Sequence, residues 1–235
     1  MNKTIVIIPT YNEKDNIKII IDKIFKYNEN VSILFVDDNS PDGTSIEIEK
    51  YNDKRINIIK REKKLGLGSA YIKGFQWAMT NGFDYVVQMD ADLSHNPADI
   101  INIISYTDNY DLVIGSRYVN GISIVNWPLS RLILSYCANL YARIITGVPI
   151  KDITGGFKAI SVNFLKKINL NNIKSEGYSF QIEINFLAWM NNCKIKEVPI
   201  IFTDRTRGES KMSKIVILEA IYMVPYLFLK KIFRF

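Results

Sequence analysis

Two aspartates, Asp90 and Asp92, form the part of the sequence best suited to chemistry. They follow the short apolar run 86–89 and precede the turn residues Asn96 and Pro97, a pattern typical of a buried strand that ends in a loop. Side chains two residues apart in an extended segment point the same way, so both carboxylates could face one ligand. Paired hard oxygen donors suit Mg²⁺ or Mn²⁺ together with a diphosphate. The alternative is a solvated acidic turn, and the surrounding elements must decide between the two.

Strands and helices alternate along the first part of the chain, with short connections between them. This alternation favours an α/β fold with a right-handed, mostly parallel sheet and helices on both faces. The expected strands are 4–8, 31–36, 56–59 and 84–89, and the expected helices are 15–27, 44–51 and 67–80.

Side chains with functional chemistry fall at the carboxyl ends of these expected strands. They come from the loops after the first, second and fourth strands, and parallel strands bring such loops to one edge of the sheet, where ligands bind. This coincidence favours a ligand site over a solvated turn. The residues concerned are Tyr11, Glu13, Asp37, Asp38, Asp90 and Asp92.

The carboxyl-terminal part of the chain ends in an apolar segment. The run 215–229 contains Glu219 and Pro225 and precedes Lys230 and Lys231. It falls short of the ~20 clean apolar residues that a bilayer span requires, so we expect an amphipathic helix lying in the membrane interface. A last helix folded onto the core is the alternative. We therefore divide the chain into a main domain, 1–211, and a membrane-associated helix, 212–235.

Composition narrows the class of protein. The 235 residues are 48% hydrophobic and 23% charged, as in a folded globule. The net charge of +6 makes an anionic partner plausible. No basic tract with interleaved aromatic residues occurs, so we expect no nucleic-acid partner. The two cysteines, Cys137 and Cys193, are interpreted as reduced core residues rather than a disulfide.

Five motifs occur together and in order, and as a set they are specific. They resemble those of the family-two glycosyltransferases and, within that family, the dolichyl-phosphate (polyprenyl-phosphate) mannosyltransferases. The resemblance extends to about residue 213 and implies a GT-A fold, in which a Rossmann-like nucleotide-binding sheet carries an Asp-x-Asp motif for a divalent metal. The motifs are PTYNE at 9–13, VDDNSPDGT at 36–44, REKKLGLG at 61–68, MDADLSH at 89–95 and RTRGESK at 205–211.

The resemblance implies a site for a nucleotide-sugar donor. A tyrosine ring can stack on a base, and carboxylates can accept hydrogen bonds from ribose or base. The implied ligands of Mg²⁺ or Mn²⁺ are Asp90, Asp92 and Ser94; some relatives carry Gln instead of Ser94, and water is the alternative to this shorter side chain. The implied donor-binding residues are Pro9, Tyr11, Glu13, Val36, Asp38, Asp90, Ala91, Asp92, Arg205 and Lys211.

The implied acceptor is a polyprenyl monophosphate. It is ionised at neutral pH and needs no general base, but it does need cations that bring one anion up to another. Arg117, Arg131 and Ser135 match the family's phosphate-binding positions, and a guanidinium can grip two phosphate oxygens at once. Solvated surface charges are the alternative for each cation. Asp92 and Arg117 are the implied catalytic residues of an in-line displacement that inverts the anomeric carbon.

The activity implied is transfer of mannose from GDP-mannose to dolichyl (polyprenyl) phosphate, which gives dolichyl β-D-mannosyl phosphate for glycan and GPI synthesis. UDP-glucose or another nucleotide sugar is the alternative donor. The intact acidic pair and arginines argue against a non-catalytic, lipid-tethered subunit. A transferase that acts on a sugar hydroxyl would need a base, and no carboxylate stands out as one.

The resemblance also implies a place of action. We expect the protein at the cytosolic face of a membrane: the endoplasmic reticulum in a eukaryote, the cytoplasmic membrane in a prokaryote. It would bind the membrane surface alone or with small membrane subunits.

Two residues near the expected site are interpreted more plainly. His95 adjoins the acidic pair, but imidazole is a poor ligand for a hard cation, which favours a structural or supporting role. Glu183 lies on an apolar helix, where it either faces the site or is a buried, hydrogen-bonded acid.

Overall fold

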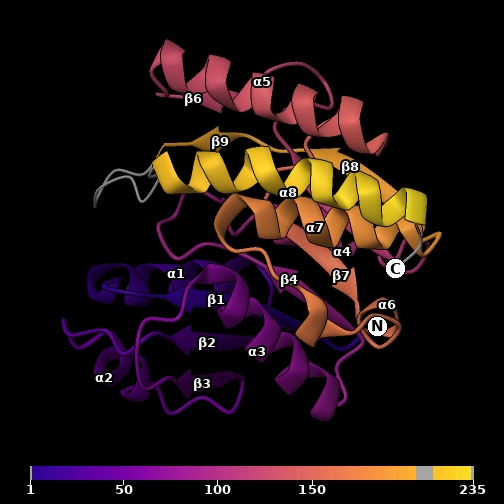
Figure 1. Cartoon of the computed structure of the whole chain (residues 1–235). Coiled ribbons are helices and arrows are strands. Elements are labelled where there is room, and N and C mark those ends of the chain that lie inside the picture. The colour runs from indigo at the N-terminus through magenta and orange to yellow at the C-terminus, as the bar shows by residue number, and fades with distance from the viewer. Residues whose placement is uncertain (1, 205–213, 234–235) are drawn as a thin grey trace.

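A seven-stranded sheet forms the centre of the molecule in the computed structural model, which describes residues 2–204 and 214–233 (Figure 1). Its strand order is β3-β2-β1-β4-β7-β5-β8, and only β7 runs antiparallel to its neighbours. The predicted mostly parallel α/β sheet is therefore confirmed. The strands are β1 (Thr4–Thr10), β2 (Ser32–Asp37), β3 (Ile56–Lys60), β4 (Tyr85–Gln88), β5 (Leu112–Ser116), β7 (Lys158–Ser161) and β8 (Ile195–Pro199).

Both faces of the sheet are covered, and β1 shows why. Its side chains alternate between two cores: Ile5 and Ile7 pack in the cluster that contains Phe75, while Val6 and Ile8 pack in the one that contains Ile17. A strand that is buried on both sides has a nearly continuous apolar sequence, and residues 4–8 have such a sequence. The helices are α1 (Lys14–Tyr27), α2 (Thr44–Glu49), α3 (Leu67–Thr80), α4 (Asp99–Ile104), α5 (Leu129–Thr146), α6 (Val162–Leu165), α7 (Gly177–Met190) and α8 (Lys214–Phe233), with a 3₁₀ turn at Leu170–Asn172.

The segment 195–203 forms two separate strands, β8 and β9. The chain leaves the large sheet at Pro199, the last residue of β8, and β9 (Phe202–Thr203) then pairs with β6 (Ile124–Val125) in a separate two-stranded sheet. Proline has no N–H to donate to a ladder, which accounts for the break. The division carries the chain from the large sheet toward the loop after β5.

The carboxyl-terminal helix α8 lies against α5 and α7 (Figure 1). Val224 and Leu227 on its inner side are fully buried, and the Tyr141 hydroxyl of α5 donates a hydrogen bond of 3.0 Å to the Ile221 carbonyl. Its other side leaves Leu218 and Tyr222 exposed. The predicted helix is present and folds back by one face, while its interfacial role and the boundary between 1–211 and 212–235 stay predictions.

No helix within residues 2–204 and 214–233 combines the length and the hydrophobicity that crossing a bilayer requires.

Helix α3 approaches β1 closely through Gly74. A Cβ atom at this position would lie 2.7 Å from Cγ2 of Ile7, a fully buried side chain without room to move. We expect Gly74→Ala to lower the free energy of unfolding by about 1–3 kcal/mol despite the better helix propensity of alanine. Urea unfolding measures the change. Lys73→Ala, at the exposed neighbouring position, is the control and should change stability little; an unaffected Gly74→Ala variant would contradict the close packing.

Candidate active site

A cleft of about 430 Å³ lies at the carboxyl ends of β1, β4 and β5 and reaches the first turns of α3 and α7. It brings together the acidic pair and both predicted phosphate-binding arginines, which come from distant parts of the sequence. Tyr11, Val36, Asp38, Ser94 and Ser135 do not line it, and Arg205 and Lys211 lie outside the described residues. The predicted residues that do line it are Pro9, Glu13, Asp90, Ala91, Asp92, Arg117 and Arg131.

The loop after β4 presents Asp90 and Asp92 to this cleft. Asp92 accepts a hydrogen bond of 3.1 Å from the Ser94 backbone N–H, and Leu93 between them has a left-handed φ of 63°. The Asp90 side chain is 38% exposed. The loop thus turns sharply just after the strand, and it keeps two carboxylates at the wall of the cleft.

His95 supports this loop from below. Its Nδ1 accepts a hydrogen bond of 3.1 Å from the Asp90 backbone N–H, so the proton of the neutral ring is on Nε2. The ring is 3% exposed and stacks on Phe157 with centroids 4.9 Å apart. This contact fits the supporting role that the sequence suggested, since it ties the backbone of Asp90 to the core.

The donor set at this loop fits a hard divalent cation. Asp90 and Asp92 supply carboxylate oxygens, the ligands that Mg²⁺ and Mn²⁺ prefer. Ser94 is 4% exposed and does not line the cleft. Of the three implied metal ligands, only Asp90 and Asp92 therefore line the space where a cation would bind. Within the described segments no three His, Cys, Asp or Glu side chains gather as a closed metal cage. Such an open pair suits a cation that also takes water and phosphate oxygens.

The second acidic motif builds the loop beside the cleft. Asp38 pairs with Arg61 and accepts hydrogen bonds from the backbone N–H groups of Leu65 and Gly66, at 3.0 and 3.2 Å. Both partners of the ion pair are nearly buried, at 8% and 7% side-chain exposure. These contacts fasten the 61–66 segment to the end of β2. Donor contact by Asp38 stays a prediction.

The ends of β1 and β2 lie beside this loop: Val36 and Asp37 are the last residues of β2, and Tyr11 follows β1. Asp37 accepts hydrogen bonds from the hydroxyls of Thr10 (2.8 Å) and Ser40 (2.6 Å) and so joins the loops after β1 and β2. The Val36 side chain is fully buried in the core. The Lys64 ammonium lies 4.1 Å from the centre of the Tyr11 ring. Lys64 lines the cleft and was not foreseen.

Arg117 is held by a buried carboxylate. Asp152, fully buried, accepts from Nε and Nη2 of Arg117 at 2.7 and 2.6 Å and from its backbone N–H at 2.9 Å. The Thr154 hydroxyl accepts from Nη2 at 2.8 Å. Burial opposes the charged guanidinium, but the charge and hydrogen bonds of Asp152 outweigh burial and raise the pKa of Arg117. Arg117 is therefore a fixed, permanent cation at the cleft.

Arg131 and Ser135 reach the same region from α5. Arg131 donates to Asp204 at 2.8 Å and stacks on Trp127, with the guanidinium 4.1 Å from the ring centre. The Tyr118 hydroxyl donates to Ser135 Oγ at 2.9 Å. The two arginines therefore line one cleft, whereas Ser135 lines the neighbouring cavity, and phosphate binding by the three residues stays a prediction.

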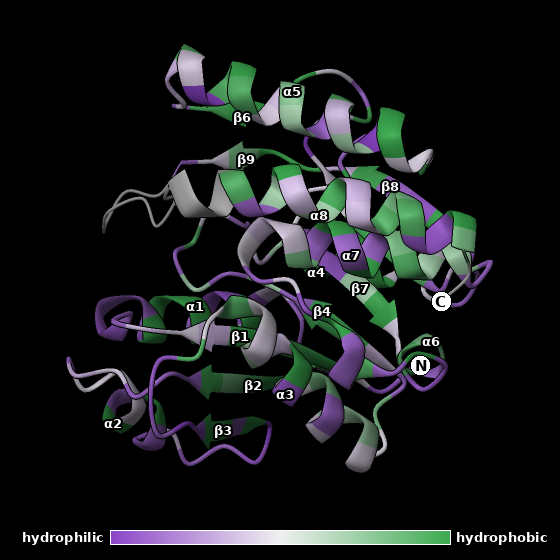
Figure 2. Ribbon diagram, in the orientation of Figure 1, coloured by the Kyte–Doolittle hydropathy of each residue, from purple (hydrophilic) through white to green (hydrophobic). Residues whose placement is uncertain are grey.

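That neighbouring cavity, of about 260 Å³, lies between α5, α7 and α8. It shares its polar edge with the cleft through Arg117, Arg131 and Thr154. Farther in, the walls are mainly apolar. Figure 2 shows hydrophobic residues interspersed with hydrophilic ones along α5, α7 and α8. The apolar wall residues include Leu134, Ala138, Tyr141, Ile182 and Val224.

Several site residues were missed from the sequence. The segment 152–156 is not among the residues that the sequence implied, yet it supplies the carboxylate that holds Arg117 and three residues of the cleft wall, Thr154, Gly155 and Gly156. Glu176 and Gln181 of the α7 region also line the cleft. For Gln181, the sequence did contain a signal: it is one of the few polar residues within the otherwise apolar helix 180–190.

The fold and the cleft define an α/β protein with a cation-ready acidic pair opposite two arginines. The chain belongs to Glycosyl transferase family 2, whose sequence profile matches residues 5–169. It is 44% identical over 226 residues to the polyprenol monophosphomannose synthase of Mycolicibacterium smegmatis, covering 94% of this chain and 85% of that protein. It is 40% identical over 224 residues to the undecaprenyl-phosphate mannosyltransferase of Micrococcus luteus, covering 94% and 92%.

Solved structures agree with this fold. Glucosyl-3-phosphoglycerate synthase from Mycobacterium tuberculosis, in complex with Mn²⁺, uridine diphosphate and phosphoglyceric acid, matches with a TM-score of 0.71 at 17% identity, covering 97% of this chain and 78% of that chain. The same synthase with Mg²⁺ and uridine diphosphate matches with a TM-score of 0.70 at 17% identity, covering 96% and 79%. The GT-A fold predicted from the motifs is confirmed.

A buried lysine beneath the cleft should make stability depend on pH. Lys158 is fully buried and donates to Asn185 Oδ1 at 2.7 Å. Burial and the Arg117 charge, partly offset by Asp152, lower its pKa from 10.5 to about 7. Because the unfolded chain binds this proton more tightly, the free energy of unfolding should rise with pH above about 7, by up to about 1.4 kcal/mol per unit.

Urea unfolding at about pH 7.5 and about pH 9 measures this rise. Lys158→Met should flatten the dependence on pH, because it removes the titrating group. The exposed Lys73→Met variant should retain the wild-type dependence. Equal slopes for wild type and Lys158→Met would contradict the prediction.

Proposed function

We propose that the protein transfers mannose from GDP-mannose to a polyprenyl phosphate, such as dolichyl phosphate, with inversion at the anomeric carbon. The observation that carries the proposal is the arrangement of the cleft. A carboxylate pair suited to a metal–diphosphate and two arginines suited to a second phosphate line the same space, which continues into an apolar cavity. The names of the two bacterial relatives support the acceptor class and the sugar.

The donor end would be held by the acidic pair and the loops around it. Asp90 and Asp92 would bind Mg²⁺ or Mn²⁺, which supplies positive charge that stabilises the departing nucleoside diphosphate. Pro9 and Glu13 line the same end of the cleft and would contact the nucleoside. Lys64 would add a positive charge close to the Tyr11 ring.

The acceptor phosphate would lie between Arg117 and Arg131. Because it is already anionic, the chain needs cations here rather than a base. The grip of Asp152 leaves Arg117 with little freedom, so no reorganisation is needed as the two anions approach. A phosphate oxygen forms a bond to the anomeric carbon while the bond to the donor's β-phosphate oxygen breaks, and that oxygen takes the electron pair.

The apolar cavity would receive the first isoprene units of the acceptor. It meets the cleft at the arginines, so a lipid phosphate bound there would have its chain directed between α5, α7 and α8. Apolar walls with a few polar groups at one end are typical of sites for amphiphilic ligands. An acceptor lacking the lipid would lose this contact.

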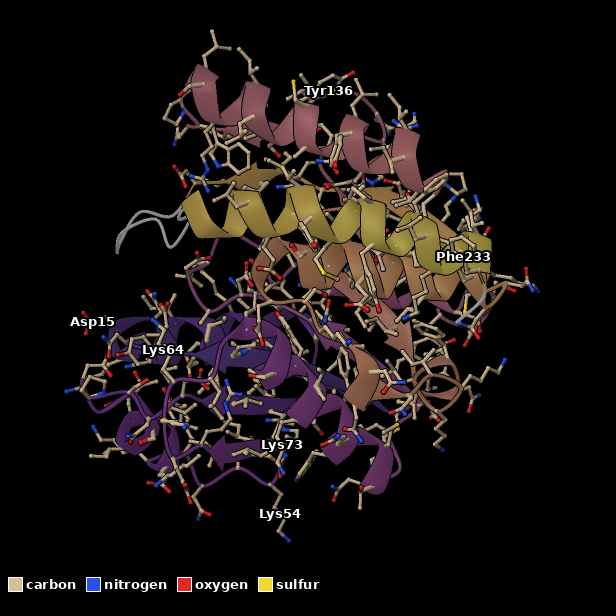
Figure 3. All side chains as sticks on the ribbon, in the orientation of Figure 1. Asp15, Lys54, Lys64, Lys73, Tyr136 and Phe233 are labelled. Atoms are coloured by element: carbon tan, nitrogen blue, oxygen red, sulfur yellow. The ribbon has the colours of Figure 1, made fainter. Side chains whose placement is uncertain are left out.

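The outer sides of α5 and α8 would lie on the membrane surface. Each helix exposes apolar side chains at spacings of three and four residues, a pattern that places them on one side of the helix. Figure 3 shows Tyr136 on α5 and Phe233 at the end of α8. Lys230 and Lys231 near that end are turned toward the protein instead: the Lys230 ammonium lies 3.9 Å from Glu183, and that of Lys231 donates to the Thr146 carbonyl at 3.3 Å. The exposed large apolar residues are Leu129, Ile133, Leu134, Tyr136, Leu140 and Ile144 of α5 and Leu218, Ile221, Tyr222, Phe228, Leu229, Ile232 and Phe233 of α8.

This assignment predicts a large effect of Asp92→Asn on catalysis. Loss of one carboxylate should lower kcat/KM for mannosyl transfer by about a hundredfold. The metal would be held less well, so the negative charge that develops on the departing nucleoside diphosphate would be stabilised less. Transfer from GDP-mannose to a polyprenyl phosphate is measured with Mg²⁺ or Mn²⁺, with UDP-glucose as the competing donor.

Asp15→Asn, at an exposed position on α1, is the control and should retain wild-type activity. Full activity of Asp92→Asn would refute the metal assignment. Preference for UDP-glucose would overturn the donor while leaving the acceptor site in place.

The outer sides of α5 and α8 predict binding to vesicles. The double variant Ile133→Glu, Tyr222→Glu should bind anionic lipid vesicles at least about fivefold more weakly, because each change places a charge on the apolar side. Cosedimentation measures the bound fraction. Ile46→Glu makes the same kind of change at an exposed residue of α2 and should bind as wild type does. Equal vesicle binding by wild type, the double variant and Ile46→Glu would exclude the outer sides of α5 and α8 as the membrane-binding surface.

A further inference from the structure

Helix α7 carries a buried amide with an unused hydrogen-bond acceptor at the wall of the cleft. Gln181 is 3% exposed and lines the cleft, yet its Oε1 has no hydrogen-bond partner among the described residues. An unsatisfied buried polar atom destabilises a fold, because it has given up its hydrogen bonds to water without a replacement. Buried polar groups in native proteins are otherwise almost always paired, so this amide indicates a partner that arrives with a ligand.

The position of the amide places that ligand near the acidic pair. A Cβ atom on Gly156 would lie 3.6 Å from Gln181 Nε2 and 3.8 Å from His95 Cε1, so this glycine touches both side chains. His95 in turn accepts a hydrogen bond from the Asp90 backbone. Gly156 also lines the cleft, and its missing side chain leaves the space before the amide open.

A carboxylate from the start of the same helix lines the same wall. Glu176, the residue before α7, accepts a hydrogen bond of 2.8 Å from the Gly68 backbone N–H through Oε2. Its own N–H donates to Glu219 of α8 at 2.7 Å, which fixes its place. Burial raises the pKa of this carboxyl group, as expected for an acid held in a partly dry pocket.

The polar residues that line the cleft therefore fall into two chemical groups. Arg117, Arg131 and Lys64 are donors and cations, which suit phosphate groups. Glu176 and Gln181 offer acceptor oxygens, and a carboxylate would repel a phosphate. Hydroxyl groups have protons to donate to such oxygens, and a hexose has several. The α7 wall is thus complementary to a sugar and not to a diphosphate.

We infer that Gln181, together with Glu176, binds hydroxyl groups of the transferred sugar and so contributes to the choice of nucleotide sugar. The inference rests on the proposed function, because it takes the ligand of the cleft to be a nucleotide sugar. Neither residue was among those implied by the sequence motifs. The diphosphate would lie beside these residues at the acidic pair, and the nucleoside would lie against the loop after β1.

The test compares a nucleotide sugar with the same nucleoside diphosphate. Gln181→Met keeps the approximate volume of the side chain and removes both hydrogen-bonding atoms. Calorimetry with Mg²⁺ should show GDP-mannose binding about tenfold more weakly to the variant, whereas GDP binding stays within about twofold. Gln76→Met, on the outer part of α3, is the matched control and should change neither affinity.

A stability readout separates ligand binding from a structural role. Because Gln181→Met removes an unpaired buried atom, its melting temperature should equal or exceed that of wild type. A variant that melts earlier and loses affinity for GDP and GDP-mannose alike would overturn the inference in favour of a structural residue. Unchanged affinity for both ligands would also overturn it.

The donor itself is checked separately. If wild type prefers another nucleotide sugar over GDP-mannose, the proposed donor is wrong, and the comparison is made with the preferred sugar and its own nucleoside diphosphate. Selective loss of that sugar's affinity in Gln181→Met would then support the inference. If wild type binds no nucleotide sugar differently from its nucleoside diphosphate, the sugar makes no contact and the inference fails.

Discussion

The arrangement of the cleft depends on one buried ion pair, Arg117 with Asp152. A reaction between two anions needs a cation whose position does not change, and a buried guanidinium is stable only if its charge is matched. Asp152 matches it with three hydrogen bonds, and the Asp152 backbone N–H itself donates to Glu197 of β8 at 2.9 Å. The pair thus joins the end of β5, the turn before β7 and strand β8. Losing either partner would leave an uncompensated charge in the core.

Helix α5 is connected to the same pair. The Asn139 amide donates to Thr154 Oγ1 at 3.0 Å, and its Oδ1 accepts from the Thr154 backbone N–H at 3.1 Å. Thr154 in turn accepts from Arg117. Packing of α5 and placement of the cation are therefore parts of one hydrogen-bonded network, which explains why polar residues are found deep between largely apolar helices.

Much of the fold and of the acidic site could be predicted from local patterns. Residues 4–8 and 86–89 are apolar runs of strand length, and the rule that ligands bind at carboxyl ends of parallel strands led directly to Asp90 and Asp92. The cations Arg117 and Arg131 needed the resemblance to a family, because a solvent-exposed arginine and a buried one look alike in sequence. Only burial and a partner such as Asp152 distinguish them.

The turn 152–156 could not be found by the same rule, because β7 runs against its neighbours. The amino end of a reversed strand lies at the carboxyl ends of the strands beside it, so its preceding turn reaches the cleft. Strand direction depends on the tertiary path of the chain, which residue patterns do not encode. Gln181 and Glu176 were missed for a related reason. Helix α7 is buried on nearly all sides, so the periodicity of its apolar residues does not mark the side that lines the cleft.

The contact between Glu219 and Glu176 has a practical consequence for making the protein easier to handle. Removing the apolar tail is an obvious way to improve solubility, but here the tail also supplies an acceptor to a backbone N–H at the edge of the cleft and packs its own Val224 and Leu227 into the core. A shortened chain would expose part of its interior and loosen the entrance to α7. Replacing outward-facing side chains one at a time leaves that inner seam intact.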